Sequence, residues 1–260
     1  MVAVLAASSG AQAGCGARHS AESTAQLTGG DGAQVSALGA ASDAGQPGSA
    51  QDTATVSADA PGTFEGRPIA PTMSHLGADW LTREERTAEE DPDALHAALA
   101  VQAGQTACDV GAGSGYHTVR LGRAVGPRGR VVASDLQPEM LALLRAYVAE
   151  QGLQNVVAVA ATATDPGLPE GGCDLIVLVD VYHELAEPEA MLVAMRRALA
   201  PGGRLVLVEF RGEDPDVPIK PEHKMTRAQV LRELQPRGFR LTDEPGELPW
   251  QHVMVFERAP

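Results

Sequence analysis

Aromatic side chains and positive charge are both scarce in this 260-residue chain. Aromatic residues make up 3% of it, and 20 Lys and Arg stand against 34 Asp and Glu, for a formal net charge of −14 at pH 7. Nucleic-acid binding needs a basic surface that neutralises phosphates, and often aromatic rings on which bases stack. Both shortages argue against a nucleic-acid partner.

Cysteine and long apolar runs are also rare. The three cysteines, Cys15, Cys108 and Cys173, form no C-x-x-C pair, and Cys108 lies in an apolar stretch where it is expected to be a small core residue. The seven histidines are scattered without ligand spacing, so no metal site is predicted. No apolar run approaches the roughly 20 residues that span a bilayer.

Large apolar residues are almost missing from residues 16–62, which consist mainly of Ala, Gly, Ser, Thr and Gln. Such a segment cannot bury enough apolar surface to offset its ordering entropy, which predicts a disordered tether over residues 1–62. Residues 1–15 contain a short apolar stretch, then A-Q-A and A-G-C, which resemble the end of a lipoprotein signal at Cys15. The stretch is short and no Lys or Arg precedes it. We expect a cytoplasmic protein, with export and a lipid anchor at Cys15 as the alternative.

The most informative stretch is D-V-G-A-G-S-G-Y-H-T, residues 109–118, between an apolar run and a helical pattern. Gly111, Gly113 and Gly115 leave the backbone bare, so an extended ligand can approach without meeting a Cβ, close to unpaired N–H groups of a helix N-terminus. Tyr116 stands where the dinucleotide fingerprint G-x-G-x-x-G needs Gly or Ala. A plain Gly-rich turn is the alternative interpretation.

After residue 64 the pattern predicts alternating strands and helices, typical of a parallel sheet covered on both faces. Helices are expected over residues 83–100, up to residue 126, over 138–151 and 188–199, and after Thr226. The pattern comprises five strand–helix units, one further helix and a terminal hairpin. Strands are expected over residues 106–110, 130–134, 155–160, 174–179, 204–210, 239–243 and 252–257.

The loop D-V-G-A-G-S-G, the motif L-A-P-G-G-R-L-V-L-V-E and the terminal hairpin together resemble the class I S-adenosylmethionine-dependent methyltransferases. The resemblance covers residues 106–257. It implies an α/β fold, a Rossmann-like seven-stranded sheet with helices on both faces, whose reversed last strand lies between the fifth and sixth. It implies S-adenosylmethionine as cofactor and divides the chain into an N-terminal cap segment, residues 63–104, and a methyltransferase domain, residues 105–260.

The resemblance also assigns cofactor contacts at the carboxyl ends of the strands, where ligands bind such sheets. Asp135 closes the second strand about 20 residues after the glycine loop, where an acidic residue binds ribose hydroxyls; capping the helix at Pro138 is its alternative role. Leu136 would face the adenine. Asp165 best matches the contact to the adenine amino group, with a plain Asp-Pro turn as the alternative. The methionine end would lie against the loop residues Asp109, Gly111, Ala112, Gly113 and Gly115.

The motif D-V-Y-H-E after the fourth strand supplies the candidate catalytic residues Asp180, His183 and Glu184, with Tyr182 beside them. Asp180 is also a candidate cofactor contact, since a positive sulfonium favours nearby carboxylates. An acceptor hydroxyl or thiol needs a base, and the ordinary pKa of a histidine such as His183 lies near neutrality. A purely structural histidine is the alternative.

Three further segments are expected near the same mouth. In the segment M-S-H-L-G-A-D-W-L, His75 and Trp80 are lid candidates. In L-P-W-Q-H, Trp250 either contacts the acceptor or, as we favour, covers the sheet edge. These motifs and D-V-Y-H-E are similar to uncharacterised bacterial predicted methyltransferases, some of which carry export signals. Other side chains expected at the mouth are Glu209, Arg211, Lys220, His223, Lys224, Gln251 and His252.

The sequence therefore predicts an S-adenosylmethionine-dependent methyltransferase with a small-molecule acceptor. Two alternatives stay open. One is another transfer on the same fold, such as aminopropyl transfer, and the other is a cofactor-binding module without catalysis.

Overall fold

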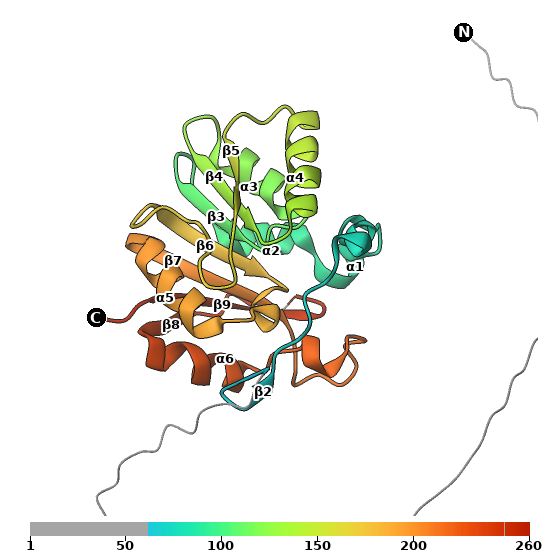
Figure 1. Ribbon diagram of the computed structural model, residues 1–260, viewed down its shortest axis with the longest axis vertical. Coiled ribbons are helices and arrows are strands. Elements are labelled where there is room, and N and C mark those ends of the chain that lie inside the picture. Colours follow the sequence, from blue (N-terminus) through green and yellow to red (C-terminus); the bar gives the residue numbers. More distant parts are fainter. Residues whose placement is uncertain (1–61, 247) are drawn as a thin grey trace, which may run out of the picture. The chain divides into compact units, whose positions relative to one another are not determined.

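The computed structural model describes residues 62–246 and 248–260, so the expected tether and the signal at Cys15 lie outside the described residues. The described part contains a seven-stranded sheet with strand order β5-β4-β3-β6-β7-β9-β8 (Figure 1). The strands are β3 (Thr106–Val110), β4 (Arg130–Asp135), β5 (Val156–Ala160), β6 (Cys173–Val179), β7 (Leu199–Phe210), β8 (Phe239–Asp243) and β9 (Gln251–Arg258).

The predicted fold class is confirmed by the direction of the last strand. Strands β3 to β7 are parallel to one another, whereas β9 pairs antiparallel with both β7 and β8. The reversed strand thus lies between the fifth and sixth strands, as expected. The helices are α1 (Arg86–Glu90), α2 (Pro92–Leu99), α3 (Tyr116–Val125), α4 (Pro138–Glu150), α5 (Pro188–Ala198) and α6 (Arg227–Leu234), with the 3₁₀ helices η1 (His75–Thr82), η2 (Tyr182–Glu184), η3 (Pro221–His223) and η4 (Gln235–Arg237).

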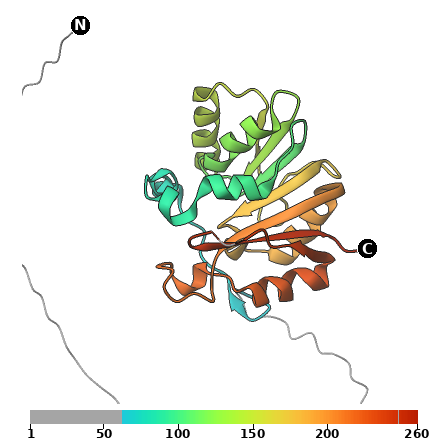
Figure 2. The same ribbon diagram turned by 180° about the vertical axis from the view of Figure 1, so that it is seen from behind.

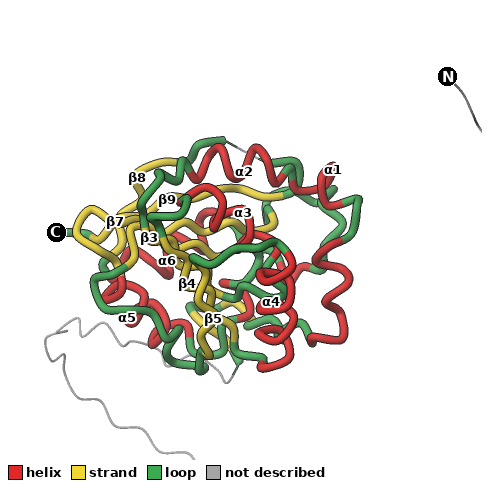
Figure 3. Tube along the Cα trace, turned by 90° about the horizontal axis from the view of Figure 1, so that it is seen from above, coloured by secondary structure: helices red, strands yellow, loops and turns green. Residues whose placement is uncertain are grey.

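Helices cover both faces of the sheet, because the central strands bury side chains on both sides. In β6, Ile176 and Leu178 pack in one core cluster with residues of α5 and α6, while Leu175 and Val177 pack in the other with residues of α2 and α3. Figure 1 shows α5 in front of the sheet and α6 below β8 and β9, and Figure 2 shows α2 and α3 from behind. The view from above places the strands between these two helical layers (Figure 3).

The single helix expected over residues 83–100 is wrong, since α1 and α2 are separate. Asp91 stands between them in the left-handed region, with φ 44°, and its carboxylate accepts from Ala94 N at 3.0 Å to cap α2. The residue before a proline avoids helical geometry, so Pro92 forces the break at Asp91 and then opens the next helix.

The third expected strand–helix unit is also wrong, because β5 is followed by residues 161–172 without a helix. Pro166 and Pro169 restrict the backbone there, and Gly167 has φ +69°. As a result this edge of the sheet is less covered, and Val157 of β5 remains 39% exposed.

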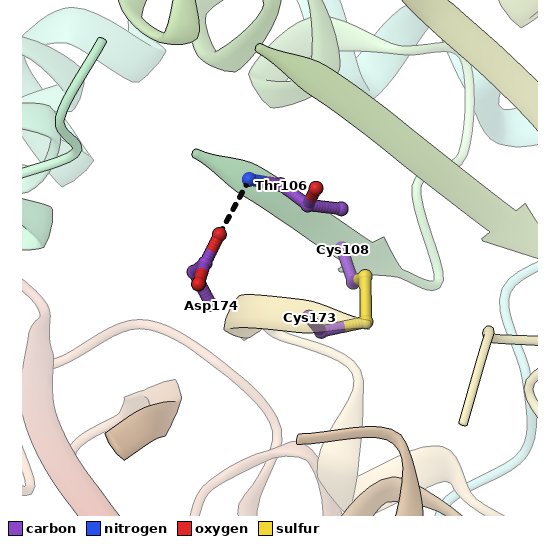
Figure 4. Close-up of a disulfide and its surroundings, with 4 residues drawn as sticks. All are labelled: Thr106, Cys108, Cys173 and Asp174. Carbon is purple, nitrogen blue, oxygen red and sulfur yellow. Dashed lines mark hydrogen bonds between the residues drawn. A yellow bond between two sulfur atoms is a disulfide. The ribbon is translucent and has the colours of Figure 1, made fainter. Parts of the chain in front are cut away.

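Cys108 is a core residue, but it is also paired, which the spacing of the cysteines did not indicate. Cys108 of β3 and Cys173 of β6, 65 positions apart in the sequence, form a disulfide with their Cα atoms 5.9 Å apart (Figure 4). Both side chains are buried. Next to it, Thr106 N donates to an Asp174 carboxylate oxygen at 2.8 Å, so the two strands are joined at one end by two interactions.

The described chain begins with a two-stranded hairpin, β1 (Thr63–Phe64) and β2 (Arg67–Pro68), that packs on α6. Phe64 belongs to the core, and Arg67 Nε binds Glu233 Oε1 of α6 at 2.7 Å. Ala70 N then donates to the carbonyl of His183 at 3.0 Å, which directs the segment toward the carboxyl ends of the strands. In the part of the chain that the structure describes, no helix is both long and apolar enough to cross a bilayer.

Candidate functional site

A cavity of about 540 Å³ lies at the carboxyl ends of the parallel strands, within the size range of small-molecule sites. The ends of β3, β4, β6 and β7 form its floor. The segment 72–86 and the loop 218–223 form its walls. Its lining includes Thr72, Met73, Trp80, Leu81, Arg86, Gly111, Gly113, Asp135, Leu136, Thr162, Asp180, His183, Glu184, Phe210, Lys220 and His223.

Two of the three loop glycines, Gly111 and Gly113, line this cavity; both have positive φ, and the packing leaves no room for a Cβ at either position. A Cβ on Gly111 would stand 2.5 Å from a methyl carbon of Val181, and one on Gly113 would stand 2.9 Å from a methyl carbon of Leu81. Gly115 instead packs on Leu144 and, like Ala112, is not among the lining residues. The bare backbone predicted from the motif is therefore needed at Gly111 and Gly113.

Asp109 lies beneath the loop rather than in the cavity lining. Its carboxylate accepts from the Thr118 hydroxyl at 2.5 Å, and burial raises the pKa of Asp109 to about 6. This bond ties β3 to α3, so in the observed geometry Asp109 shapes the glycine loop from below.

Asp135 and Leu136 both line the cavity, where the sequence placed the ribose and adenine contacts. The two carboxylate oxygens of Asp135 accept from Gly113 N at 2.9 Å and from Gln137 N at 2.8 Å. Gln137 is the residue at the N-cap of α4, so Asp135 supports the preceding turn and the glycine loop instead of capping the helix itself.

Asp165 is not among the lining residues, and its carboxylate accepts from Gly167 N at 2.8 Å. Thr162 N donates to the Asp165 carbonyl at 2.8 Å, which closes a tight turn. This is the Asp-Pro turn that the sequence left open as the alternative. Lining residues after β5 are Ala161, Thr162 and Ala163.

Asp180 is held in an unfavourable backbone conformation at the end of β6. Its φ is +55°, a left-handed value that costs free energy outside glycine and is found preferentially at functional sites. Gln251 donates to Oδ2 of Asp180 at 2.6 Å, while the buried Oδ1 has no hydrogen-bond partner among the described residues. Burial, with the nearby charges of Glu90 and Glu209, holds the pKa of Asp180 well above its ordinary value.

His183 lines the cavity and is fixed from behind by a buried carboxylate of β7. Its Nδ1 lies 2.5 Å from Glu209 Oε2, and the other oxygen of Glu209 accepts from Tyr182 N at 2.8 Å. A carboxylate can only accept, so Nδ1 carries the proton and Nε2 carries the lone pair. Tyr182, in contrast, points away from the mouth where we expected it, and its hydroxyl donates to Glu233 at 2.8 Å.

Glu184 and His223 complete this side of the cavity. Glu184 Oε2 accepts from Met73 N at 3.2 Å, and burial raises the pKa of Glu184. His223 comes from the loop after β7, and its Nδ1 lies 3.1 Å from His183 Nε2. Lys220 of the same loop also lines the cavity, whereas Arg211 and Lys224 bind Asp214 and are not among the lining residues.

Of the two lid candidates in η1, Trp80 lines the cavity, whereas His75 is not among the lining residues. The Gln137 side chain bridges to this segment, accepting from His75 N at 2.9 Å and donating to the Met73 carbonyl at 2.9 Å. Trp80 also stacks under the Arg83 guanidinium at 3.5 Å.

Gln251, the first residue of β9, is connected to the cavity through the hydrogen bond that its side chain donates to Asp180. Trp250 packs near Phe210, with ring centres 6.5 Å apart, and is not among the lining residues. His252 is buried and also lies off the cavity.

Sequence reasoning missed a buried ion pair in α1 that reaches the cavity. Arg86 lines it and binds Glu90 at 2.5 Å, and both side chains are almost completely buried. Their i,i+4 spacing in a helix was a usable signal for the pair, although not for its position beside the cavity.

The carboxylates in and under the cavity favour a ligand with positive charge. Burial raises the pKa of Asp109, Asp135, Asp180 and Glu184, so each is costly to ionise in the ligand-free protein. A cationic group among them would stabilise their ionised forms. The sulfonium and ammonium groups of S-adenosylmethionine are cations of this kind. The backbone without Cβ atoms at Gly111 and Gly113 leaves room for the extended part of that cofactor.

Comparisons with known proteins agree with this geometry. A family model described as a methyltransferase domain matches residues 107–203. A ubiquinone/menaquinone biosynthesis C-methyltransferase of Marinomonas sp. is 33% identical over 149 residues, 57% of this chain. The chain spans about half the length of this curated relative, 55%.

Solved structures extend the similarity to most of the described residues. The crystal structure of a SAM-dependent methyltransferase from Aquifex aeolicus matches with a TM-score of 0.67 and 26% identity, over 71% of this chain and 98% of that one. The [4+2]-cyclase SpnF shares the fold with a TM-score of 0.51 and 22% identity, over 58% of each chain. Since a cyclase is built on the same fold, the reaction has to be argued from the site.

Proposed function

Since the chain belongs to the class I S-adenosylmethionine-dependent methyltransferases, we propose that its cavity transfers the cofactor's methyl group to a small-molecule acceptor. The observation that carries this proposal is the unpartnered, buried Oδ1 of Asp180 at the mouth of β6, held there by a strained backbone. Buried polar atoms in proteins nearly always have a hydrogen-bond partner, and a ligand in the cavity would supply one for this oxygen.

The cofactor would lie across the carboxyl ends of β3 and β4. Asp135 would accept hydrogen bonds from the ribose hydroxyls, Leu136 would cover the adenine, and the methionine end would lie along Gly111 and Gly113. Ala112 and Gly115 complete the loop, and Asp109 would act on the cofactor through the loop it supports.

When bound, S-adenosylmethionine supplies a methyl group on a positively charged sulfur. Asp180 and Glu184 would place negative charge beside that sulfur, and the lid segment with Trp80 would exclude water. His183 would accept the proton of an acceptor hydroxyl or thiol at Nε2, while Glu209 stabilises the positive charge that then develops on the ring.

Titration calorimetry with S-adenosylmethionine tests the cofactor site, and two acidic residues offer a matched pair. Asp135→Ala should weaken binding at least tenfold, because charge-assisted hydrogen bonds are worth about 1.5–3 kcal/mol each. Asp165→Ala also removes a carboxylate that follows a strand, but off the cavity, and should leave affinity unchanged. Equal effects of the two substitutions would contradict the placement of the ribose.

Incubation with methyl-labelled cofactor and the small-molecule fraction of a cell lysate tests catalysis. We expect label in a small molecule, dependent on the protein and lost in Asp180→Ala. Tight cofactor binding without any transfer would instead support the module without catalysis, and transfer of an aminopropyl group would support the other alternative.

A further inference from the structure

Three potential metal ligands from two distant segments meet in one wall of the cavity. His183 Nε2 and His223 Nδ1 are 3.1 Å apart, and Glu184 Oε1 lies 3.9 Å from the first and 3.7 Å from the second. A triangle with these sides has a circumradius of about 2.1 Å, so one ion at its centre would stand about 2.1 Å from all three atoms. Zinc–nitrogen and zinc–carboxylate distances in proteins are about 2.0–2.2 Å.

The donor set suits a divalent transition metal. Two imidazole nitrogens and one carboxylate are the ligands of catalytic zinc sites and of non-haem iron sites that keep positions open for other ligands. Hard ions such as Mg²⁺ prefer an all-oxygen set. The three side chains line the cavity, so open positions on an ion would face the ligand space.

The surroundings of His183 are also those of a metal ligand. Metal-bound histidines usually donate their second ring N–H to a carboxylate or carbonyl, which fixes the tautomer and the ring orientation. Glu209 does this for His183 at 2.5 Å, and both side chains are almost fully buried. Glu209 thus occupies Nδ1, and Nε2, which faces His223 Nδ1 at 3.1 Å, is the ring nitrogen that can bind an ion once His223 Nδ1 gives up its proton.

We propose that His183, Glu184 and His223 bind a divalent transition-metal ion, with Zn²⁺ or Fe²⁺ as the fitting class. Spacing along the sequence does not indicate such a site, because 40 residues separate the two histidines. The site itself is independent of methyl transfer.

Its catalytic use rests on the proposed function. An acceptor hydroxyl or thiol bound at an open position would lose its proton to solvent on coordination and keep the electron pair that attacks the methyl carbon. As the new bond to the methyl carbon forms, the methyl–sulfur bond of the cofactor breaks, and its electron pair stays on the sulfur of the departing neutral thioether. Coordination uses the same lone pair as general-base catalysis by His183, so the metal-loaded and metal-free proteins should differ in turnover.

Cobalt titration of the full-length, tag-free protein after removal of metals tests the site, because Co²⁺ bound to such ligands absorbs visible light. We expect one Co²⁺ per chain, displaced by Zn²⁺. His223→Gln and Glu184→Gln should each weaken binding at least tenfold, and Glu209→Gln should weaken it about 10- to 100-fold, as outer partners of metal ligands do.

The second close histidine pair of the described residues provides the control. His96 Nε2 and His117 Nδ1 are also 3.1 Å apart, but His117 Nε2 contacts the Arg86 guanidinium at 3.0 Å, and among the described residues no third ligand atom joins this pair. His96→Gln should leave cobalt binding unchanged, with thermal unfolding confirming that each variant is folded. Absence of stoichiometric cobalt binding, or binding that survives His223→Gln, would overturn the metal site.

Calorimetry with S-adenosylmethionine on the same samples separates this proposal from the proposed function. Cofactor binding without metal binding refutes only the metal site, whereas metal binding without cofactor binding refutes only the methyltransferase assignment.

Discussion

Glu209→Gln alters one hydrogen-bond pattern while almost preserving the volume of a completely buried side chain. In the wild type, one oxygen of Glu209 accepts from Tyr182 N and the other faces His183 Nδ1. A glutamine puts one oxygen and one NH₂ group in those places. If its oxygen stays on the Tyr182 N–H, its NH₂ group must donate to His183 Nδ1, and the imidazole proton moves to Nε2.

The opposite amide orientation leaves the buried N–H of Tyr182 without an acceptor, at a cost of about 1–3 kcal/mol. This free energy corresponds to a preference of about 5- to 150-fold for the orientation that moves the proton. In most molecules His183 would then lack a free lone pair at Nε2. We expect turnover to fall roughly 10²–10⁴-fold, the usual contribution of general acid–base catalysis. Cofactor affinity should stay within about twofold of the wild type.

The nitrogen chemical shifts of the imidazole in the metal-free protein report the tautomer directly and need no acceptor. His183→Asn identifies the signals by removing them. Glu233→Gln serves as the control, because Glu233 is an equally buried carboxylate bound to Arg67 and Tyr182 and is not among the residues that line the cavity. It should lower stability without moving the His183 proton. A proton that stays on Nδ1 in Glu209→Gln, or a moved proton with wild-type turnover, would refute the reasoning.

Three further perturbations follow from the geometry. Gly111→Ala should weaken cofactor binding at least tenfold in calorimetry, because its Cβ would overlap Val181. Gly152→Ala is the control, since Gly152 has nearly the same φ (+68° against +71°) but open space around it. This control should keep the wild-type affinity and lose only the about 1–2 kcal/mol of unfolding free energy that a left-handed alanine costs. Burial raises the pKa of Asp135, Asp180 and Glu184, and that of Asp109 to about 6, so these groups bind protons more readily than exposed carboxylates do, and a cation beside them lowers their pKa again. Affinity for S-adenosylmethionine should therefore rise with pH over the range in which these groups titrate. The accompanying proton release is detected by calorimetry in two buffers and should be smaller for the demethylated product, whose sulfur is uncharged. Equal proton release for both ligands would contradict the role of the carboxylates. Replacing Cys108 and Cys173 by alanine opens a loop of 65 residues and should lower the free energy of unfolding by about 4 kcal/mol, or Tm by roughly 10 °C. Cys15→Ala, the control, should leave Tm unchanged. A Tm of the double variant within about 2 °C of the wild type would mean that the disulfide does not constrain the unfolded chain.

Local patterns in the sequence determined the sheet and its ligand side. Strand 106–110 was predicted with the bounds that the structure has, and α4 was predicted from Pro138 to within one residue of its end. Both depend on short-range chemistry, namely the apolar period and the proline and glycine positions at element ends. The terminal hairpin likewise specified the reversed β9, and the loop motif placed Gly111, Gly113 and Asp135 at the cavity.

Only the tertiary structure decided which side chains meet. The Cys108–Cys173 disulfide, the Arg67–Glu233 ion pair and the approach of His223 to His183 join residues 65, 166 and 40 positions apart, separations at which no local period carries information. The same holds where local chemistry allowed two outcomes. Asp165 turned back on Gly167 and Tyr182 turned toward Glu233, because the direction of a loop side chain depends on the partner that packing brings within hydrogen-bond distance.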